Sequence, residues 1–103
     1  MKIFISQPMR DKTEEEILTE RNKIINKVKA HLGEDTEFID LINDEKLYTK
    51  NKPVWHLGKS IQLLSQADGA VFVKGWKNAR GCRLEHEICK YYGIPIINWR
   101  IPQ

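Results

Sequence analysis

The sequence predicts an α/β sandwich built on a parallel sheet. Short apolar runs alternate along the chain with longer segments whose apolar residues recur at helical spacing. One run, residues 70–73, is continuously apolar, which is typical of a central strand covered on both faces. Strands that alternate with helices imply parallel pairing through right-handed crossovers, so we expect a single domain over residues 1–103.

The first half of the chain supplies two strands and one helix. Residues 2–5 are short and rich in β-formers, and they read as a buried strand. Thr13 and Glu16 match a capping box and start a helix whose apolar residues keep helical spacing as far as Gly33. Residues 37–39 form a second short strand.

The second half of the chain begins with a polar segment, residues 41–53, that has no clear period. A loop of this length in a compact domain is often a lid or a binding loop. The remaining elements are a helix over about residues 54–65, the strand 70–73, a helix from Arg80 to Tyr92 that ends at Gly93, and a last strand over residues 95–99.

We predict that the four strands form a parallel sheet in the order 2-1-3-4. With helices on both faces, this sheet makes a small flavodoxin-like, or Rossmann-like, three-layer sandwich. In such sheets ligands bind beyond the carboxyl ends of the strands where the strand order reverses, here between strands one and three. The loops on that edge cover residues 6–12 and 74–81 and contain Ser6, Arg10, Lys12, Lys74, Lys77 and Arg80. We therefore expect a site for a small anionic ligand at this edge.

The start of the third helix carries the most informative residues. Arg80 and Arg83 are unfavourable at the positive end of a helix dipole unless a phosphate or carboxylate lies among them. Glu85, one turn further, is expected to be half buried and kept ionised by the same field, available as a nucleophile or base. Arg83 is expected to pair with Glu87. The apolar arc expected to face the core consists of Leu84, Ile88, Tyr91 and Tyr92.

Other titratable side chains are weaker candidates. Asp40 follows a strand and is a candidate for binding a ligand hydroxyl, with a solvated loop aspartate as the commoner alternative. Asp68 precedes its strand, where a cap or turn role is expected. His86 projects roughly opposite the core and is expected at the surface.

Composition narrows the classes of function. A hydrophobic fraction of 41% and a charged fraction of 30% are those of a globular protein, and no stretch approaches the apolar length of a membrane span. We expect a cytoplasmic protein that contacts no membrane. The net charge of +3 is mild and the lysines are scattered, so no polymeric nucleic acid is expected. No metal or cofactor is expected either, because the histidines and cysteines lack metal-ligand spacing.

Three segments together resemble a small family, common in phages and bacteria, that is labelled only as a domain of unknown function, DUF4406. The segments are residues 2–9 (KIFISQPM), residues 57–61 (LGKSI) with Ala67-Asp68, and Gly75-Trp76 with residues 79–85 (ARGCRLE). The resemblance covers nearly the whole chain. That family is in turn similar to the nucleoside 2-deoxyribosyltransferases and the deoxynucleoside monophosphate N-glycosidases, through the exit of strand one and the Gly-x-x-x-Glu of the third helix.

The resemblance implies a nucleotide N-glycosidase that cleaves the base from a (deoxy)nucleoside monophosphate. In the enzymes the matching glutamate attacks the anomeric carbon and displaces the base, a retaining displacement that needs an ionised carboxylate. The expected site is Glu85 as the catalytic residue, with Ser6, Gln7, Arg10, Trp76, Arg80 and Gly81 for the substrate and its phosphate. A homodimer or larger homo-oligomer, with neighbouring subunits completing the site, is also implied.

Alternatives stay open at this point. Ala79 stands where the transferases carry an aspartate and the glycosidases tend to carry a serine, which disfavours base transfer. Trp76 stacks on a base in one interpretation and packs on its own helix in the other. The alternative functions are a non-catalytic nucleotide-binding or sensing module and an interaction protein without a small-molecule site.

Overall fold

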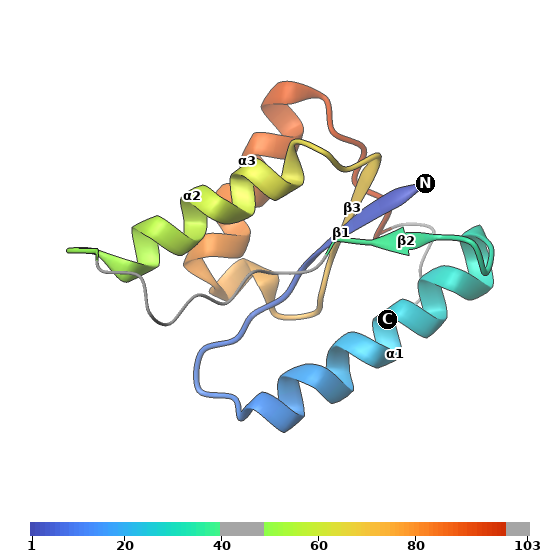
Figure 1. Ribbon diagram of the computed structural model, residues 1–103, viewed down its shortest axis with the longest axis horizontal. Coiled ribbons are helices and arrows are strands. Elements are labelled where there is room, and N and C mark those ends of the chain that lie inside the picture. Colours follow the sequence, from blue (N-terminus) through green and yellow to red (C-terminus); the bar gives the residue numbers. More distant parts are fainter. Residues whose placement is uncertain (40–48, 99–103) are drawn as a thin grey trace.

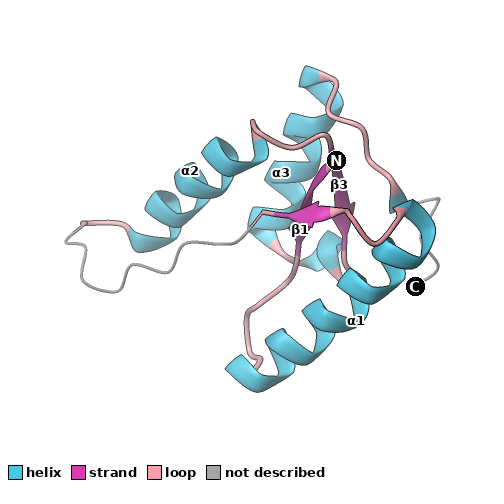
Figure 2. Cartoon of the chain, turned by 45° about the vertical axis from the view of Figure 1, so that its right-hand side comes forward, coloured by secondary structure: helices cyan, strands magenta, loops and turns pink. Residues whose placement is uncertain are grey.

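The computed structural model describes residues 1–39 and 49–98, which form a sheet between two helical layers (Figures 1 and 2). The parallel strands are β1 (Lys2–Ser6), β2 (Glu37–Phe38) and β3 (Gly69–Phe72), in the order β2-β1-β3. Helix α1 (Glu14–Leu32) covers one face, and α2 (Lys52–Leu64) and α3 (Arg80–Tyr92) lie on the other. A short 3₁₀ helix, η1 (Trp76–Asn78), leads into α3.

Alternation along β1 divides the core into two halves. Ile3 and Ile5 lie in a cluster with residues of α1, whereas Phe4 lies in a second cluster with residues of α2 and α3. Because successive strand side chains point to opposite faces, Ser6 faces the same side as Phe4, toward α3. Gln7 follows on the α1 side, and both are buried where β1 ends.

Side-chain caps explain where α1 and α2 begin. Thr13 Oγ1 accepts a hydrogen bond from the Glu16 backbone amide at 3.1 Å, and Glu16 Oε1 accepts one from the Thr13 amide at 3.3 Å, so the predicted capping box is confirmed. Helix α2 begins two residues earlier than predicted, because Asn51 caps it and Pro53 occupies its first turn. Proline suits that position, since its missing amide hydrogen has no partner there anyway.

The outer edge of β3 is completed by one bridge and one side chain. The Ala70 amide donates to Pro95 O and the Ile97 amide donates to Ala70 O, both at 2.9 Å. Beyond this bridge, Asn98 Oδ1 accepts from the Phe72 amide at 2.7 Å, and its Nδ2 donates to Phe72 O at 2.6 Å. The described residues therefore confirm a parallel α/β sandwich but not the fourth strand, nor the four-stranded order 2-1-3-4.

Helix α3 turns a different face to the sheet from the predicted one. Leu84 is 46% exposed, and Tyr91 and Tyr92 are 77% and 80% exposed. The buried residues of this helix are Cys82, Glu85 and Cys89. Of the residues expected at the core, Ile88 packs against the cluster that contains Phe4 and Phe72, whereas Leu84 and the two tyrosines are exposed and Cys89 joins that cluster. The catalytic candidate thus lies at the centre of the buried face.

Within the described residues, no helix combines the length and the apolar character needed to cross a membrane. Of the predicted polar loop, residues 41–48 lie outside the part of the chain that the structure describes, and so does Asp40. Trp99, the last residue of the predicted fourth strand, also lies outside it.

Candidate functional site

A buried hydrogen bond between Ser6 and Glu85 joins the end of β1 to the second turn of α3. Ser6 Oγ donates to Glu85 Oε1 at 2.8 Å. Ser6 is 1% exposed and Glu85 is 6% exposed. Among the described residues, Oε2 of Glu85 accepts no hydrogen bond. The pair lies at the carboxyl edge of the sheet, beside the boundary between β1 and β3 where the site was expected.

The ionisation of Glu85 differs from the sequence-based expectation. Burial raises its pKa to about 7, and the hydrogen bond from Ser6 opposes that rise. The sequence suggested that the positive end of α3 keeps this carboxyl ionised, but the cost of removing the charge from water is the larger effect. Near neutral pH the protonated and ionised forms are both well populated.

Two thiols flank Glu85 on the same buried face, Cys82 one turn before it and Cys89 one turn after it. Burial raises the pKa of the Cys82 thiol, with contact to Ser6 opposing the rise and the Glu85 charge adding to it. Burial, again with the Glu85 charge, raises the pKa of Cys89 to about 11. Both thiols are therefore protonated near neutral pH, and Glu85 is the member of this cluster that titrates there.

The start of α3 has no side-chain cap from the part of the chain that the structure describes. Ala79 precedes the helix and has no polar side chain, and among the described residues no side chain caps the first-turn amides. A Cβ added to Gly81 would meet no atom within 4 Å, so the space beside this turn is also open. Arg80 is exposed at the first helical position. Free amides and a nearby cation are the features that bind an anion at a helix end.

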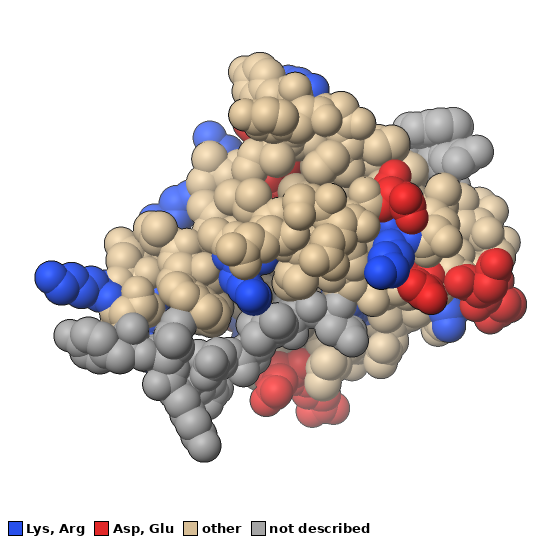
Figure 3. All heavy atoms as spheres, turned by 45° about the horizontal axis from the view of Figure 1, so that its top comes forward, with Lys and Arg blue, Asp and Glu red and all other residues tan. Residues whose placement is uncertain are grey.

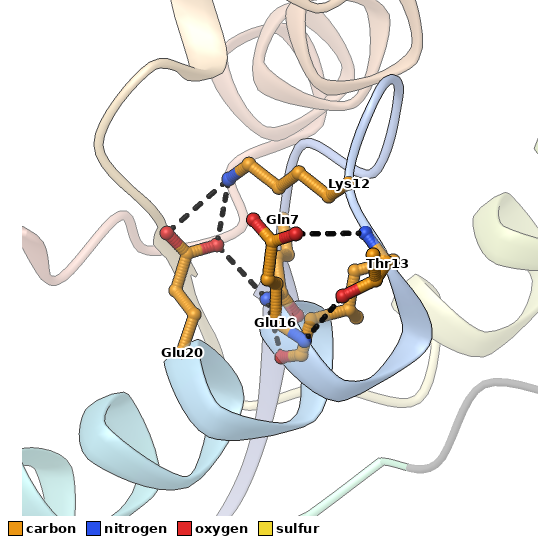
Figure 4. A network of polar contacts seen from close by, with 6 residues as sticks. Gln7, Lys12, Thr13, Glu16 and Glu20 are labelled. Atoms are coloured by element: carbon orange, nitrogen blue, oxygen red, sulfur yellow. Dashed lines mark hydrogen bonds and ion pairs between the residues drawn. The ribbon is translucent and has the colours of Figure 1, made fainter.

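The side chain of Gln7 points toward α1, where it meets Glu20 (Figure 4). Its Nε2 donates to Ile17 O at 2.8 Å and to Glu20 Oε1 at 3.0 Å, while Lys12 Nζ lies 3.0 Å from the same Glu20 oxygen. Burial opposes ionisation of Glu20, but the hydrogen bonds from Gln7 and Lys12 lower its pKa overall. Gln7 and Lys12 thus brace the β1–α1 loop against α1. Gln7 Oε1 is buried and has no hydrogen-bond partner within residues 1–39 and 49–98.

Trp76 of η1 packs against α3, in agreement with one of the two interpretations that the sequence left open. Gly75 has φ +94°, a conformation that favours glycine, and it turns the chain so that η1 lies against α3. The Trp76 ring stacks on His86 with centroids 4.1 Å apart, and Phe72 meets His86 edge-on at 4.9 Å. His86 is therefore half-buried rather than at the surface as expected. Burial, together with the Lys90 charge, lowers its pKa.

An open groove of about 600 Å³ runs along the outer face of α3. Its lining includes Trp76, Lys77, Arg80, Arg83, His86 and Lys90. At 100° per residue, Arg83 and Lys90 lie about 140–160° around the helix axis from Glu85, so the groove and the buried carboxyl are on opposite sides. The pair expected between Arg83 and Glu87 is not what the described residues show, since Glu87 Oε1 lies 3.9 Å from Lys90 Nζ.

The predicted site residues thus divide among several surroundings. Ser6 and Glu85 are in contact, whereas Arg10 is exposed in the β1–α1 loop and Arg80 lines the outer groove. Asp68 lies at the opposite edge of the sheet, where its Oδ2 accepts from the Lys2 amide at 2.7 Å in the expected turn role. Within the described residues, no cluster of three or more His, Cys, Asp or Glu side chains is placed to hold a metal ion.

Sequence reasoning missed the contribution of His86 and Lys90 to the groove. The spacing of Arg83 and Lys90, seven residues apart on one helix, is a signal that both share a face. No residue spacing in the sequence indicates that Trp76 lies against His86, because this contact depends on how η1 folds back onto α3.

The family model described as "Domain of unknown function (DUF4406)" matches residues 1–98. The chain therefore belongs to the DUF4406 family, as its three characteristic segments indicated. No curated protein and no solved structure matches the chain. The likeness to deoxyribosyltransferases and N-glycosidases stays a prediction.

Proposed function

We propose that this member of the DUF4406 family is a nucleotide N-glycosidase of the nucleoside 2-deoxyribosyltransferase-like kind. It cleaves the base from a (deoxy)nucleoside monophosphate, with Glu85 as the nucleophile. The observation that carries the proposal is the buried contact of 2.8 Å between Ser6 and Glu85, at the carboxyl edge of the sheet and one turn from an uncapped helix start. In this proposal the Glu85 carboxyl is the nucleophile, the Ser6 hydroxyl orients it, and the free amides at the start of α3 bind the phosphate.

In the proposed reaction, the ionised Glu85 attacks the anomeric carbon through Oε2 while Ser6 holds Oε1. The bond from Oε2 to the anomeric carbon forms as the bond from that carbon to the base nitrogen breaks. The base leaves with the electron pair and takes a proton from solvent, and water then hydrolyses the glycosyl-enzyme. With a pKa of about 7, a large share of the carboxyl is ionised at neutral pH.

The phosphate of the substrate binds the amides around Gly81, with Arg80 and Arg10 supplying positive charge from the two neighbouring loops. Both arginines are exposed and belong to segments that begin at the same edge of the sheet. Gln7 Oε1 offers an unpaired acceptor close to the end of β1. Trp76 reaches a base only with the part of its ring that His86 leaves exposed. A neighbouring subunit of a homodimer or larger homo-oligomer completes the site.

The test is release of free base from deoxynucleoside monophosphates, measured by chromatography. Wild-type protein is expected to release base, and Glu85→Gln is expected to lower the rate at least about a thousandfold because it removes the nucleophile. Glu87→Gln is the matched control, since it makes the same chemical change on the exposed side of the same helix. This control is expected to keep the wild-type rate.

Each other outcome has a distinct meaning. Absence of base release, with nucleotides still raising the melting temperature, contradicts the enzyme and supports the nucleotide-binding module. Base release that is unchanged in Glu85→Gln contradicts the assignment of the nucleophile. A melting temperature that no nucleotide changes contradicts a nucleotide site of either kind.

A further inference from the structure

The outer groove of α3 carries more positive charge than the proposed nucleotide site uses, since of its basic residues that site takes only Arg80. Four cations line it, Lys77, Arg80, Arg83 and Lys90, against one anion, Glu87. That anion lies 3.9 Å from Lys90, so three cations remain without an acidic partner among the lining residues. On the face shown in Figure 3, uncharged surface separates most of the Lys and Arg side chains.

The cations are spread along the helix rather than gathered around one point. From Arg80 to Lys90 the helix rises about 15 Å. This spacing suits a ligand whose negative charges repeat along a chain better than it suits a single phosphate. The groove is partly open to solvent, so the lining cations are accessible to a ligand.

Aromatic rings lie in the same groove as the cations. Trp76 and His86 form a stacked pair with centroids 4.1 Å apart, and Lys77 Nζ lies 5.8 Å from the Trp76 centroid. Aromatic rings within a basic groove are the combination that binds single-stranded nucleic acid, because unpaired bases have free faces for stacking while the backbone meets the cations. An acidic peptide uses the cations but leaves the rings without a partner.

We propose that the outer groove of α3 binds a single strand of nucleic acid through its phosphates, with a base against the Trp76–His86 pair. The scattered lysines of the sequence argued against a polymeric nucleic acid, but the fold brings four cations to one groove. Arg80 and Trp76 are shared with the proposed nucleotide site, whereas Arg83 and Lys90 lie on the side of α3 opposite Glu85 and serve only the strand.

The experiment measures fluorescence anisotropy of a labelled single-stranded oligodeoxythymidylate of about ten nucleotides at about 50 mM salt. Arg83→Glu reverses a charge inside the groove, and Lys23→Glu reverses one at an exposed position of α1, across the sheet. Arg83→Glu is expected to weaken binding at least about tenfold and to reduce the slope of log affinity against log salt by about 1. Lys23→Glu is expected to change affinity less than about twofold, and both variants keep the wild-type melting temperature.

Several results would overturn the proposal. One is that wild type causes no rise of anisotropy. Another is that Lys23→Glu and Arg83→Glu lose affinity equally. The third is that polyglutamate or a DNA duplex of matched charge binds as tightly as the single-stranded oligodeoxythymidylate. The result is independent of the enzymatic proposal, because base release from monophosphates is expected to be the same in Arg83→Glu and wild type.

Discussion

At the scale of residues, the protonation of Glu85 links the candidate site to the stability of the fold. Burial raises the pKa of this carboxyl to about 7 from an ordinary value of 4.5. The native protein therefore binds this proton more tightly than the unfolded chain does. Stability from this group is fully present below pH 4.5 and is lost as the pH rises through 7.

Replacing Glu85 by glutamine is expected to remove this pH dependence. Between pH 5 and 8, wild type loses at most about 3 kcal/mol of unfolding free energy that the neutral amide of Glu85→Gln does not lose. Urea denaturation of both proteins at the two pH values measures the difference. The comparison with wild type cancels the contribution of His86, whose pKa is lowered and which acts in the opposite direction. Equal pH dependence in the two proteins would contradict a Glu85 that is buried and titrates near 7.

Ser6 is expected to set the position and the pKa of Glu85 rather than to react itself. Ser6→Ala removes the hydrogen bond that opposes the rise of the Glu85 pKa, so the midpoint of the Glu85 titration should move above 7. The unfolding free energy should fall by about 1 kcal/mol, because Oε1 loses its partner. NMR titration of the side-chain carboxyl carbon measures the midpoint directly. A Glu85 midpoint that stays in place or falls in Ser6→Ala would refute the role given to Ser6. Ser6→Thr keeps the hydroxyl, so its Glu85 midpoint is expected to return toward the wild-type value.

The candidate residue could be predicted from the sequence, but its surroundings could not. Glu85 was identified from its place one turn inside a helix that starts with arginines. Its full burial was missed because Leu84 and the two tyrosines of α3 were expected to face the core. Which face of a helix packs inward depends on how closely it approaches the sheet, and Cys82 and Cys89 pack at that contact.

At the scale of elements, the edge of β3 shows where sequence patterns stop being sufficient. Residues 95–99 have the composition of a strand, but residues 95–97 make one bridge and the side chain of Asn98 then pairs with both backbone groups of Phe72. A side-chain amide carries a donor and an acceptor, as a backbone unit does, so it satisfies the strand without extending the sheet. No periodicity distinguishes this arrangement from a short strand. By contrast, the capping box of α1 is local in sequence and was predicted correctly.

Asn98→Ala is expected to destabilise the protein by about 2 kcal/mol, since it removes the two hydrogen bonds that the Asn98 side chain makes to the amide and carbonyl of Phe72 at a half-buried edge. Chemical denaturation measures the loss. Asn78→Ala, at an exposed position of η1, is the control and should change stability by less than about 0.5 kcal/mol. Equal stability of Asn98→Ala and wild type would mean that these two hydrogen bonds do not hold the edge in solution.

At the scale of the whole molecule, α3 separates two surfaces of different character. Its inner side holds Glu85 against the sheet, and its outer side forms a groove lined by basic and aromatic residues. The layered α/β architecture follows from the alternation of strands and helices, and it could be predicted from the sequence. The division of charges between the two sides of α3 could not, because it depends on the rotation of one helix about its axis and on the path of η1.

Detection of a glycosyl-enzyme tests the central claim most directly. Wild-type protein is mixed with a deoxynucleoside monophosphate, quenched in acid and digested, and the peptide that contains Glu85 is weighed by mass spectrometry. We predict a mass increase equal to one deoxyribose phosphate residue on that peptide, absent in Glu85→Gln and retained in Glu87→Gln. Base release by wild type with no adduct on this peptide, or with an adduct on another residue, would contradict Glu85 as the nucleophile.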